Sequence, residues 1–334
     1  MSKPQPNFIH TRSGPVRFPA YIPVTTFGDK YPLDDLVRPY LPRLAPAVMV
    51  SLHYARQMEQ RPRLPIMVDS GGFACLMKDT SLESQNGLGV LVRSAEEGTE
   101  RIHPTEVLDF QEQVADIAFT LDFPIPPGTP SGEAKRRLEL TIANAIWALE
   151  NRRRRDLVLY ACVQGWDIAS YAQCAKAYTH CDFDGIAIGG LVPRLRDREN
   201  LFRIVKTIRK LVRNKPLHVF GVGKPEIVAD LYRLGVQSVD SSSYVKLAAE
   251  GKMWSQSDFC LPDASAIERL HLAIYNLAHA CQAAIPLSAQ MRLLKQIDGE
   301  SPHKENPEND SPTGIRDISG TYIPNLAKAY QAVL

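Results

Sequence analysis

The feature that most constrains this chain is an alternation of short apolar runs with longer helical stretches. The runs are rich in Val, Ile, Leu, Phe and Ala and mostly lack polar alternation, which is typical of strands buried on both faces of a parallel sheet. We expect eight such strands, at Tyr21–Thr25, Ala47–Ser51, Pro65–Asp69, Ala118–Asp122, Leu157–Val163, Gly185–Ile188, Leu217–Gly221 and Ser238–Asp240.

Helical stretches separate most of these runs. They are expected at Pro104–Val114, Ser131–Arg152, Asp167–Tyr178, Arg198–Val212, Pro225–Gly235 and Pro262–Ala284. A proline at the start of the last helix is tolerated because its missing N–H costs little there. Eight strands with helices between them favour the α/β class and a closed (β/α)8 TIM-type barrel over an open doubly wound sheet. We expect this barrel in residues 1–296, with an N-terminal extension, a long flap and a C-terminal helix.

Two segments interrupt the alternation. Residues 74–103 form a long stretch with scattered Gly, Ser and Glu, which we interpret as an active-site flap. Residues 297–313 are polar and have no apolar pattern, so 297–334 is expected to be a flexible linker and a short C-terminal segment.

Composition limits the classes of function. The 334 residues carry a formal net charge of only +2, so any nucleic-acid surface must come from local clustering of Arg and Lys. The N-terminus lacks the apolar core of a signal peptide, and no apolar run approaches a membrane helix. We therefore expect a cytoplasmic protein without membrane contact. The six cysteines form no CxxC pair and are interpreted as reduced thiols.

Polar and small residues gather where the expected strands end, which is where chemistry collects in this class of barrel. Three strands end in Asp69, Asp122 and Asp240, and a fourth leads to Gln164. Three turns at this rim contain glycine. They are Ser70-Gly71-Gly72-Phe73, which directly follows Asp69, and Gly189-Gly190-Leu191 and Phe220-Gly221. A single Asp at a strand end commonly caps the next helix. Three of them, beside glycines that let a ligand approach the backbone, favour a site, and glycosidic-bond chemistry is a natural use of paired carboxylates.

At these same residues the chain resembles the tRNA-guanine transglycosylase family. The matching stretches keep the family's order and rough spacing from about residue 8 to 254. They are Phe18–Thr25 (FPAYIPVT), Val68–Phe73 (VDSGGF), His103–Glu112 (HPTEVLDFQE), Leu121–Pro127 (LDFPIPP), Val163–Gly165 (VQG), Gly185–Pro193 (GIAIGGLVP), Phe220–Glu226 (FGVGKPE) and Leu234–Asp240 (LGVQSVD).

The resemblance implies a covalent base exchange. Asp240 would attack the sugar C1′ and expel guanine, and Asp69 would act as the general acid/base. Asp122 would accept hydrogen bonds from the N1–H and amino group of the base. Gln164 and the N–H of Gly190 would donate to the base oxygen.

The resemblance also implies a pocket around the base. Phe73 and Phe220 would stack on its two faces, and the target nucleotide would have to leave its own stack to enter. Ser70, Gly71, Gly72, Gly189, Leu191 and Gly221 would complete the pocket. Alternatives remain open at this point: Gln164 could satisfy a buried carbonyl, and both phenylalanines could belong to the core.

The family's structural zinc site is missing in its usual form, a tight Cys-x-Cys-x-x-Cys run with a distant His. After Asp240 the candidate ligands are Cys260, His271, His279 and Cys281. Since His279 and Cys281 are two residues apart on an expected helix, they point in different directions. We expect neither a cofactor nor a structural zinc ion.

Two other departures concern the substrate. Where the tRNA enzymes carry a Pro-Thr-Arg stretch after the nucleophile, this chain has Ser241-Ser242-Ser243, which resembles the family's branch that inserts 7-deazaguanine bases into DNA. No Glu suited to a cationic base follows Gly189-Gly190-Leu191, so the neutral 7-cyano-7-deazaguanine fits better. The expected partners are DNA first, tRNA second, and a free 7-deazaguanine base. Helper proteins and a homodimer are left open.

Two arginine groups are conspicuous. Arg194, Arg196 and Arg198 lie just beyond a rim turn and are candidates for phosphate contacts, although a solvated helix face is the usual explanation of such a run. Arg152–Arg155 precede a strand at the opposite end, and we assign them to solubility.

Three rival functions remain. They are the same exchange on tRNA, a catalytically idle family member that only binds nucleic acid, and a retaining glycosidase, which needs carboxyl groups ~5–5.5 Å apart. The presence of both Asp69 and Asp240 disfavours the idle binder, because binding alone needs no nucleophile.

Overall fold

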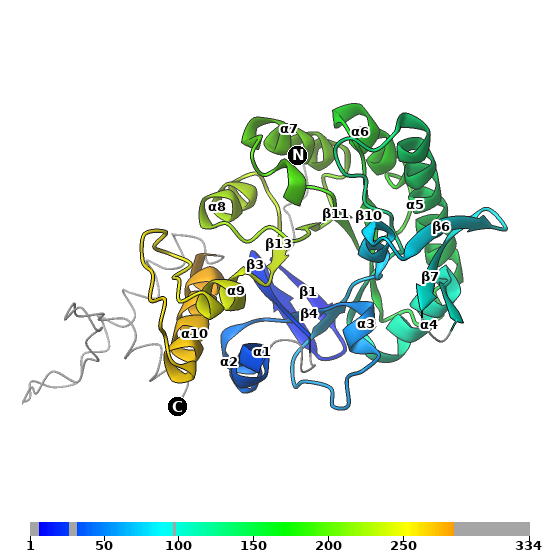
Figure 1. The fold of residues 1–334 in the computed structure, drawn as a ribbon. Coiled ribbons are helices and arrows are strands. Elements are labelled where there is room, and N and C mark those ends of the chain that lie inside the picture. Colours follow the sequence, from blue (N-terminus) through cyan, green and yellow to red (C-terminus); the bar gives the residue numbers. More distant parts are fainter. Residues whose placement is uncertain (1–6, 27–31, 96–97, 284–334) are drawn as a thin grey trace, which may run out of the picture.

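The computed structural model describes residues 7–26, 32–95 and 98–283. At its centre is a closed barrel of parallel strands in the order β10-β11-β12-β13-β3-β4-β5-β9 (Figure 1). These strands are β3 (Ala20–Thr25), β4 (Val48–Val50), β5 (Ile66–Val68), β9 (Ile117–Phe119), β10 (Val158–Val163), β11 (Gly185–Ile188), β12 (Leu217–Val219) and β13 (Ser238–Ser241). The expected fold class is confirmed, and every expected strand is present with its ends shifted by a few residues.

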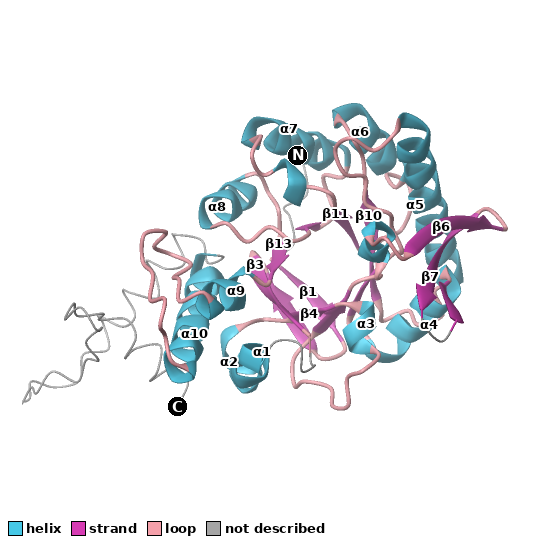
Figure 2. Ribbon diagram, in the orientation of Figure 1, coloured by secondary structure: helices cyan, strands magenta, loops and turns pink. Residues whose placement is uncertain are grey.

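Helices form a ring outside the barrel (Figure 2). They are α1 (Pro32–Val37), η1 (Arg38–Tyr40), α2 (Leu41–Leu44), α3 (Leu52–Ala55), η2 (Gly72–Leu76), α4 (Pro104–Val114), α5 (Ser131–Asn151), α6 (Ile168–Ala177), η3 (Val192–Arg194), α7 (Arg198–Leu211), α8 (Pro225–Arg233), α9 (Ser243–Ala249) and α10 (Ala266–Ala283). The last begins four residues later than expected. Ser265 and Glu268 cap it reciprocally: the N–H of Ser265 donates to Oε2 of Glu268 at 2.7 Å, and the N–H of Glu268 donates to Oγ of Ser265. The helix therefore begins after Ser265 and not at Pro262.

Side chains of the strands divide between two cores. Ile22 and Met67 belong to the cluster inside the barrel, whereas their neighbours Tyr21 and Val68 pack outward against the helices. This alternation explains why the strands read as continuous apolar runs. The inner cluster is closed at the N-terminal end of the strands by an antiparallel hairpin, β1 (Phe8–Thr11) and β2 (Gly14–Arg17). Val16 of the hairpin is fully buried there.

Most of residues 74–103, the stretch expected to be an active-site flap, is regular structure rather than loop. It forms a three-stranded antiparallel sheet of β6 (Thr80–Gln85), β7 (Leu88–Ala95) and β8 (Gly98–Ile102), which Figure 1 shows outside the barrel beside α5. Asn144 of α5 holds it in place, because its side chain exchanges hydrogen bonds with the N–H and the carbonyl of Gly89 at 2.9 and 3.1 Å. A side chain at Gly89 would collide with the Phe123 ring.

Arginines at the N-terminal end of the barrel join its parts. Arg152 is buried and donates to Asp184 and to the Leu157 carbonyl, and Arg153 pairs with Glu112. The assignment of Arg152–Arg155 to solubility is therefore wrong for Arg152, whereas Arg153 remains exposed to solvent although it pairs with Glu112. The expected linker and C-terminal segment, 297–334, lie outside the described residues. Within the part of the chain that the structure describes, no helix is long and apolar enough to cross a membrane.

Candidate active site

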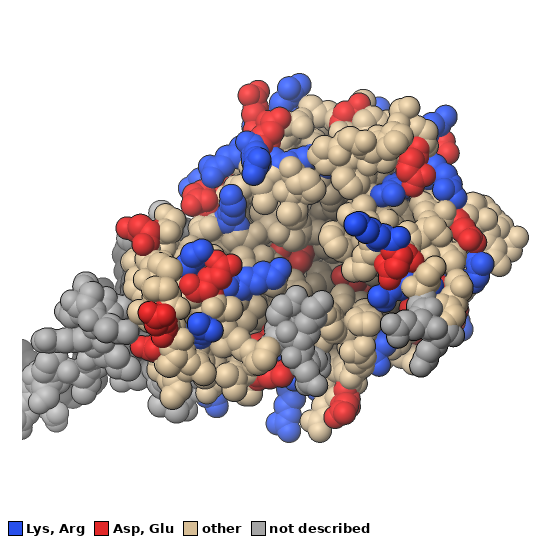
Figure 3. All heavy atoms as spheres, viewed as in Figure 1, with Lys and Arg blue, Asp and Glu red and all other residues tan. Residues whose placement is uncertain are grey.

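A cavity of about 250 Å³ opens at the C-terminal end of the barrel strands. The space-filling view shows a hollow at the centre of this face, with acidic side chains inside it (Figure 3). Most of the residues expected at the site line this cavity. They are Asp69, Ser70, Gly72, Phe73, Asp122, Gln164, Gly189, Gly190, Phe220, Gly221 and Asp240.

Two expected pocket residues lie behind the lining instead. Leu191 is fully buried in the outer core. Gly71 supports the site through its backbone, since its N–H donates to Asp69. The structure adds an apolar part of the lining that the sequence did not indicate: Leu76, Pro124, Pro126, Val192 and Pro193. Proline and aliphatic walls beside three carboxylates suit a ligand with a flat face and a polar edge.

Asp69 follows β5 and is held by the backbone. Its Oδ1 accepts hydrogen bonds from the N–H groups of Leu52, at 3.0 Å, and Gly71, at 2.9 Å. Burial raises the pKa of this carboxyl group to about 6; the two N–H donors oppose the shift, and the charges of Asp122 and Asp240 add to it. A carboxyl group with a pKa near neutrality can both donate and accept a proton, as a general acid/base must.

Asp122 is bonded to two neighbours in the cavity wall. Its Oδ1 accepts from Oγ of Ser70 at 3.0 Å, and its Oδ2 accepts from Nε2 of Gln164 at 2.6 Å. Burial raises the pKa of Asp122, and these two donors oppose the shift. Gly72 is needed beside it, because a Cβ there would lie 1.8 Å from the carbonyl oxygen of Asp122.

Gln164 is positioned by the glycine turn after β11. A Cβ at Gly189 would lie 2.1 Å from its Nε2, and one at Gly190, whose φ is +70°, 2.9 Å from its Oε1. That Oε1 is buried without a hydrogen-bond partner among the described residues. Buried polar atoms are normally paired, so the unpaired oxygen favours a ligand-binding role for Gln164 over a purely structural one.

Asp240 is the third residue of β13 and is bonded from two sides. Its Oδ1 accepts from the N–H of Gly221 at 3.0 Å and lies 3.0 Å from Nε2 of His218. His218 is fully buried on β12, and sequence analysis missed it. A signal was present, because consecutive strands of such a barrel are neighbours and a polar residue inside the preceding run would face the last strand.

The two phenylalanines differ in their surroundings. Phe73 is 66% exposed, so the alternative that it belongs to the core is wrong. Phe220 is partly buried and packs on the rings of Phe119 and His218, with centroids 4.8 and 4.9 Å away, while also lining the cavity. One aromatic ring at the mouth and one at the wall are both available to a planar ligand.

The arginines beyond the β11 turn do not act as one group. Arg194 is only 6% exposed. Its guanidinium donates to the carbonyls of Gly190, Ile125 and Gly165, which ties together the loops after three neighbouring strands. This placement speaks against the phosphate contact that the sequence suggested for Arg194. Arg196 and Arg198 are exposed, and Arg198 lies 3.7 Å from Glu226.

Within the described residues, the four candidate zinc ligands do not form a cluster with one another. Across the described ranges, no three His, Cys, Asp or Glu side chains gather closely enough to hold an ion. The His279 ring lies against Tyr275, with centroids 4.2 Å apart, and the Cys281 thiol faces the Tyr21 carbonyl at 3.8 Å. Cys260 is exposed.

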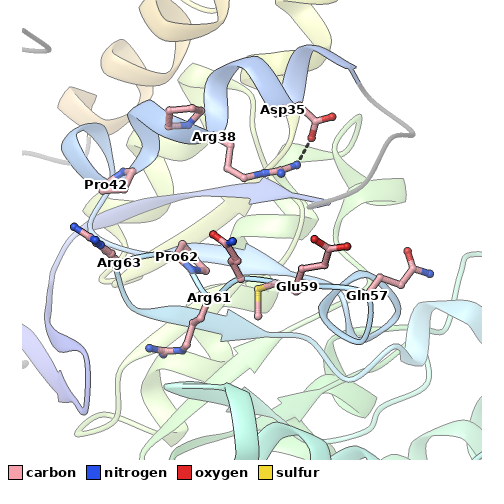
Figure 4. A pocket seen from close by; sticks show the side chains of 11 residues that line it. Asp35, Arg38, Pro42, Gln57, Glu59, Arg61, Pro62 and Arg63 are labelled. Carbon is pink, nitrogen blue, oxygen red and sulfur yellow. Dashed lines mark hydrogen bonds and ion pairs between the residues drawn. The ribbon is translucent and has the colours of Figure 1, made fainter.

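A larger hollow of about 760 Å³ lies between α1–η1 and the segment 57–63 that precedes β5 (Figure 4). Several of its charged side chains form ion pairs within the fold: Arg38 pairs with Asp35, as Figure 4 shows, and Arg61 pairs with Asp116. None of its lining residues lines the carboxylate cavity. Size alone is therefore a poor guide, and we place the candidate active site at the smaller cavity.

Fold and cavity together define a (β/α)8 barrel protein with a carboxylate-rich pocket at the C-terminal rim. The model of the family described as queuine tRNA-ribosyltransferase matches residues 41–285, and the chain belongs to this family. The resemblance to tRNA-guanine transglycosylases is thus confirmed at the level of the family.

Similar proteins come from archaea and bacteria. The chain is 32% identical over 162 residues to a tRNA-guanine(15) transglycosylase of Methanocaldococcus jannaschii, which covers 46% of this chain and 25% of the relative. It is 28% identical over 274 residues to a queuine tRNA-ribosyltransferase of Helicobacter acinonychis, covering 75% of this chain and 71% of the relative. A protein of the same description from Thermosipho africanus is 30% identical over 196 residues, or 56% of this chain and 52% of the relative. The chain thus matches about a quarter of the archaeal protein's length and a larger share of the bacterial ones.

Proposed function

We propose that this protein exchanges guanine in a nucleic acid for a free 7-deazaguanine base through a covalent bond between Asp240 and the sugar. The observation that carries the proposal is the convergence of Asp69, Asp122 and Asp240 on one small cavity with Phe73 at its mouth. Membership of the family supports the same chemistry.

The exchange takes two balanced steps. In the first, a carboxylate oxygen of Asp240 bonds to C1′ while the bond from C1′ to the guanine nitrogen breaks, and protonated Asp69 gives its proton to the leaving base. In the second, Asp69 takes a proton from the ring nitrogen of the incoming base, which attacks C1′ and frees the Asp240 carboxylate. A pKa of about 6 lets Asp69 serve in both directions near neutral pH.

Recognition of the base is assigned to the opposite wall. Asp122 offers two acceptor oxygens, which match the N1–H and amino donors of guanine and of a 7-deazaguanine alike. In the structure these oxygens are satisfied by Ser70 and Gln164. An incoming base would take over the bond to Oδ2, leaving Nε2 of Gln164 to donate to the base oxygen.

A polymer substrate is supported by a second hollow of about 530 Å³, which we call the side groove. It shares Asp69 and Phe73 with the cavity, and its walls follow the neighbouring strands β3, β4, β5 and β13. Arg56, Arg93 and Lys246 lie along it. Arg56 and Arg93 are already paired with Glu100 and Asp79, so Lys246, exposed on α9, is the side chain that we assign to a phosphate next to the exchanged nucleotide.

We favour DNA as the polymer and 7-cyano-7-deazaguanine as the incoming base. The support is Ser241-Ser242-Ser243 after the nucleophile and a β11 turn without an acidic residue for a cationic base. The printed descriptions of the relatives favour tRNA instead, which is therefore the second candidate.

One experiment distinguishes these substrates. The protein is incubated with labelled 7-cyano-7-deazaguanine and either duplex DNA or bulk tRNA, and the label in each polymer is counted. We expect label in DNA. Asp240→Ala protein gives the background label. Label in tRNA alone would show that tRNA, the second candidate, is the substrate. Label above background in neither polymer would contradict the proposed exchange.

A further inference from the structure

A buried histidine lies directly behind the proposed nucleophile. His218 is 0% exposed and stands between two side chains of the adjacent strand, with Nδ1 2.8 Å from Oγ of Ser238 and Nε2 3.0 Å from Oδ1 of Asp240. The register of the parallel pair β12–β13 sets His218 opposite Ser238. The proposed mechanism does not use this histidine. His218 and Ser238 are not part of the cavity lining and lie behind Asp240.

The neighbours of the ring define the position of its protons. An ionised carboxylate can only accept hydrogen bonds, so Nε2 of His218 must carry the hydrogen that it shares with Asp240. Ser238 can donate its hydroxyl hydrogen to Nδ1, which keeps the neutral ring in that one tautomer. The ring cannot easily turn away, because Phe119 and Phe220 pack against it with centroids 5.2 and 4.9 Å distant.

A second donor binds the same oxygen of Asp240, so the two carboxylate oxygens differ in their surroundings. The N–H of Gly221 and Nε2 of His218 both bond to the same oxygen, Oδ1. The structure shows no partner for Oδ2 among the described residues, and Asp240 lines the cavity. One oxygen is thereby fixed by the protein, which leaves the other to react.

We propose that His218 is a positioning residue that, with Ser238 fixing its tautomer, selects Oδ2 of Asp240 as the nucleophilic oxygen. This inference rests on the proposed function, in which Asp240 attacks C1′. As the ester forms, Oδ1 becomes its carbonyl oxygen and keeps both donors. When the ester breaks, the same two donors stabilise the returning negative charge, so His218 helps the enzyme to release the sugar as well as to capture it.

Removal of the donor should slow chemistry without weakening binding. In His218→Phe we expect kcat to fall about 10- to 100-fold, as the loss of one hydrogen bond to a charged group would cause, while KM for base and polymer stays within about twofold. His218→Gln, which returns an N–H donor, should recover part of kcat. Ser238→Ala should lower kcat by about 3- to 10-fold, because the tautomer is then no longer fixed.

A matched control separates this role from simple destabilisation. Ser170→Ala removes a buried hydroxyl that accepts from the N–H groups of Trp166 and Asp167 at the start of α6 and does not touch Asp240, so it should lower the unfolding midpoint while leaving kcat unchanged. All variants are measured in full-length protein, with the unfolding midpoint and the amount of covalent protein–sugar adduct recorded beside kcat. If His218→Phe fails to fold, the kcat of Ser238→Ala tests the positioning role instead.

The results distinguish failure of this inference from failure of the proposed function. Wild-type kcat in both His218→Phe and Ser238→Ala, with Asp240→Ala inactive, would overturn the positioning role and leave the exchange intact. An equal fall of kcat in Ser238→Ala and Ser170→Ala would also overturn it. Absence of exchange by the wild-type protein would contradict the proposed function itself.

Discussion

At the N-terminal end of the barrel, the buried carboxylate of Asp116 is held by Arg61 and by Arg12 of the hairpin. At the C-terminal end, Asp69 and Asp122 line one cavity, and the described residues provide neither with an ion pair to Arg or Lys. Both ends bury carboxyl groups, but only one end neutralises them. A buried charge is costly unless it is paired, so the N-terminal carboxylate stabilises the fold, whereas the unpaired rim carboxylates are the groups to which we assign the proposed chemistry.

The difference shows in the pKa values at the rim. Burial raises the pKa of both Asp69 and Asp122, which is the direction expected when no cation compensates the lost solvation. Sites with such perturbed groups are typically places where stability has been given up for function. The comparison predicts that substitutions at the two ends affect activity and stability in opposite ways.

The largest effect is expected on activity, at Asp240. Asp240→Ala should lower exchange by more than about 10⁴-fold, because the covalent route is lost. Its free energy of unfolding, measured by urea titration, should change by less than about 1 kcal/mol. Asp258→Ala, at an exposed position, is the control and should exchange normally. Substantial exchange by the Asp240 variant would remove that residue from its role.

At the opposite end, Arg61→Ala should act on stability. Asp116 would keep the N–H of Ile66 and, among the described residues, a single ion pair, to Arg12 at 3.5 Å. We expect the free energy of unfolding to fall by about 2–3 kcal/mol, less than for a fully buried pair because Arg61 is partly exposed. Exchange at a temperature well below unfolding should be unaffected. Arg63→Ala, in the same segment, serves as the control. An equal loss in both variants would show that the ion pair is not the cause.

Asp69→Asn tests the sign of the pKa shift. Because the folded protein holds this proton up to about pH 6 and the unfolded chain only to about pH 4, wild-type stability should fall as pH rises through that window. Asn does not titrate and can accept the same two N–H bonds. The variant should therefore match the wild type near pH 4 and be more stable by about 1–2 kcal/mol at pH 7, with the cavity's contact with solvent limiting the gain.

The counterpart at the N-terminal end completes that comparison. Asp116→Asn removes a carboxylate that two arginines hold, so it should be less stable than the wild type at pH 7. Urea titrations of both Asn variants at a series of pH values provide the measurement. If Asp69→Asn were also destabilised at pH 7, the two ends would not differ as described.

The smallest effect is expected in the side groove. Lys246→Ala should weaken binding of the polymer by only a few-fold and reduce the slope of log K against log salt by about 0.9, the contribution of one phosphate in duplex DNA. KM for the free base should not change. Lys206→Ala on the outer helix α7 is the matched control, and an unchanged salt slope in Lys246→Ala would place the polymer elsewhere.

Much of the fold follows from the sequence because the strands are buried on both faces. Such strands appear as unbroken apolar runs, and the residues that end them, Asp69, Asp122 and Asp240, must meet at one rim. The hairpin and the β6–β8 sheet lacked such a signal. Their positions depend on contacts with distant residues, such as Asn144 with Gly89, which no local pattern reveals.

The direction in which side chains point was the other property of the site that the sequence could not predict. Arg194 stood in a basic run typical of a solvated or phosphate-binding surface, yet its guanidinium turns inward to carbonyl oxygens. His218 lies in an apolar strand, and its importance appears only once the neighbouring Asp240 is set beside it. The sequence indicated which loops meet at the cavity, whereas the structure was needed to show which donors hold its carboxylates.

The central claim is that Asp240 bonds to the sugar, and trapping that bond tests it most directly. The protein is mixed with polymer in the absence of a replacing base, denatured, digested and examined by mass spectrometry. The account predicts a sugar-linked adduct on the peptide that contains Asp240, absent from Asp240→Ala. An adduct on Asp69 instead, or active exchange with no adduct at residue 240, would contradict it.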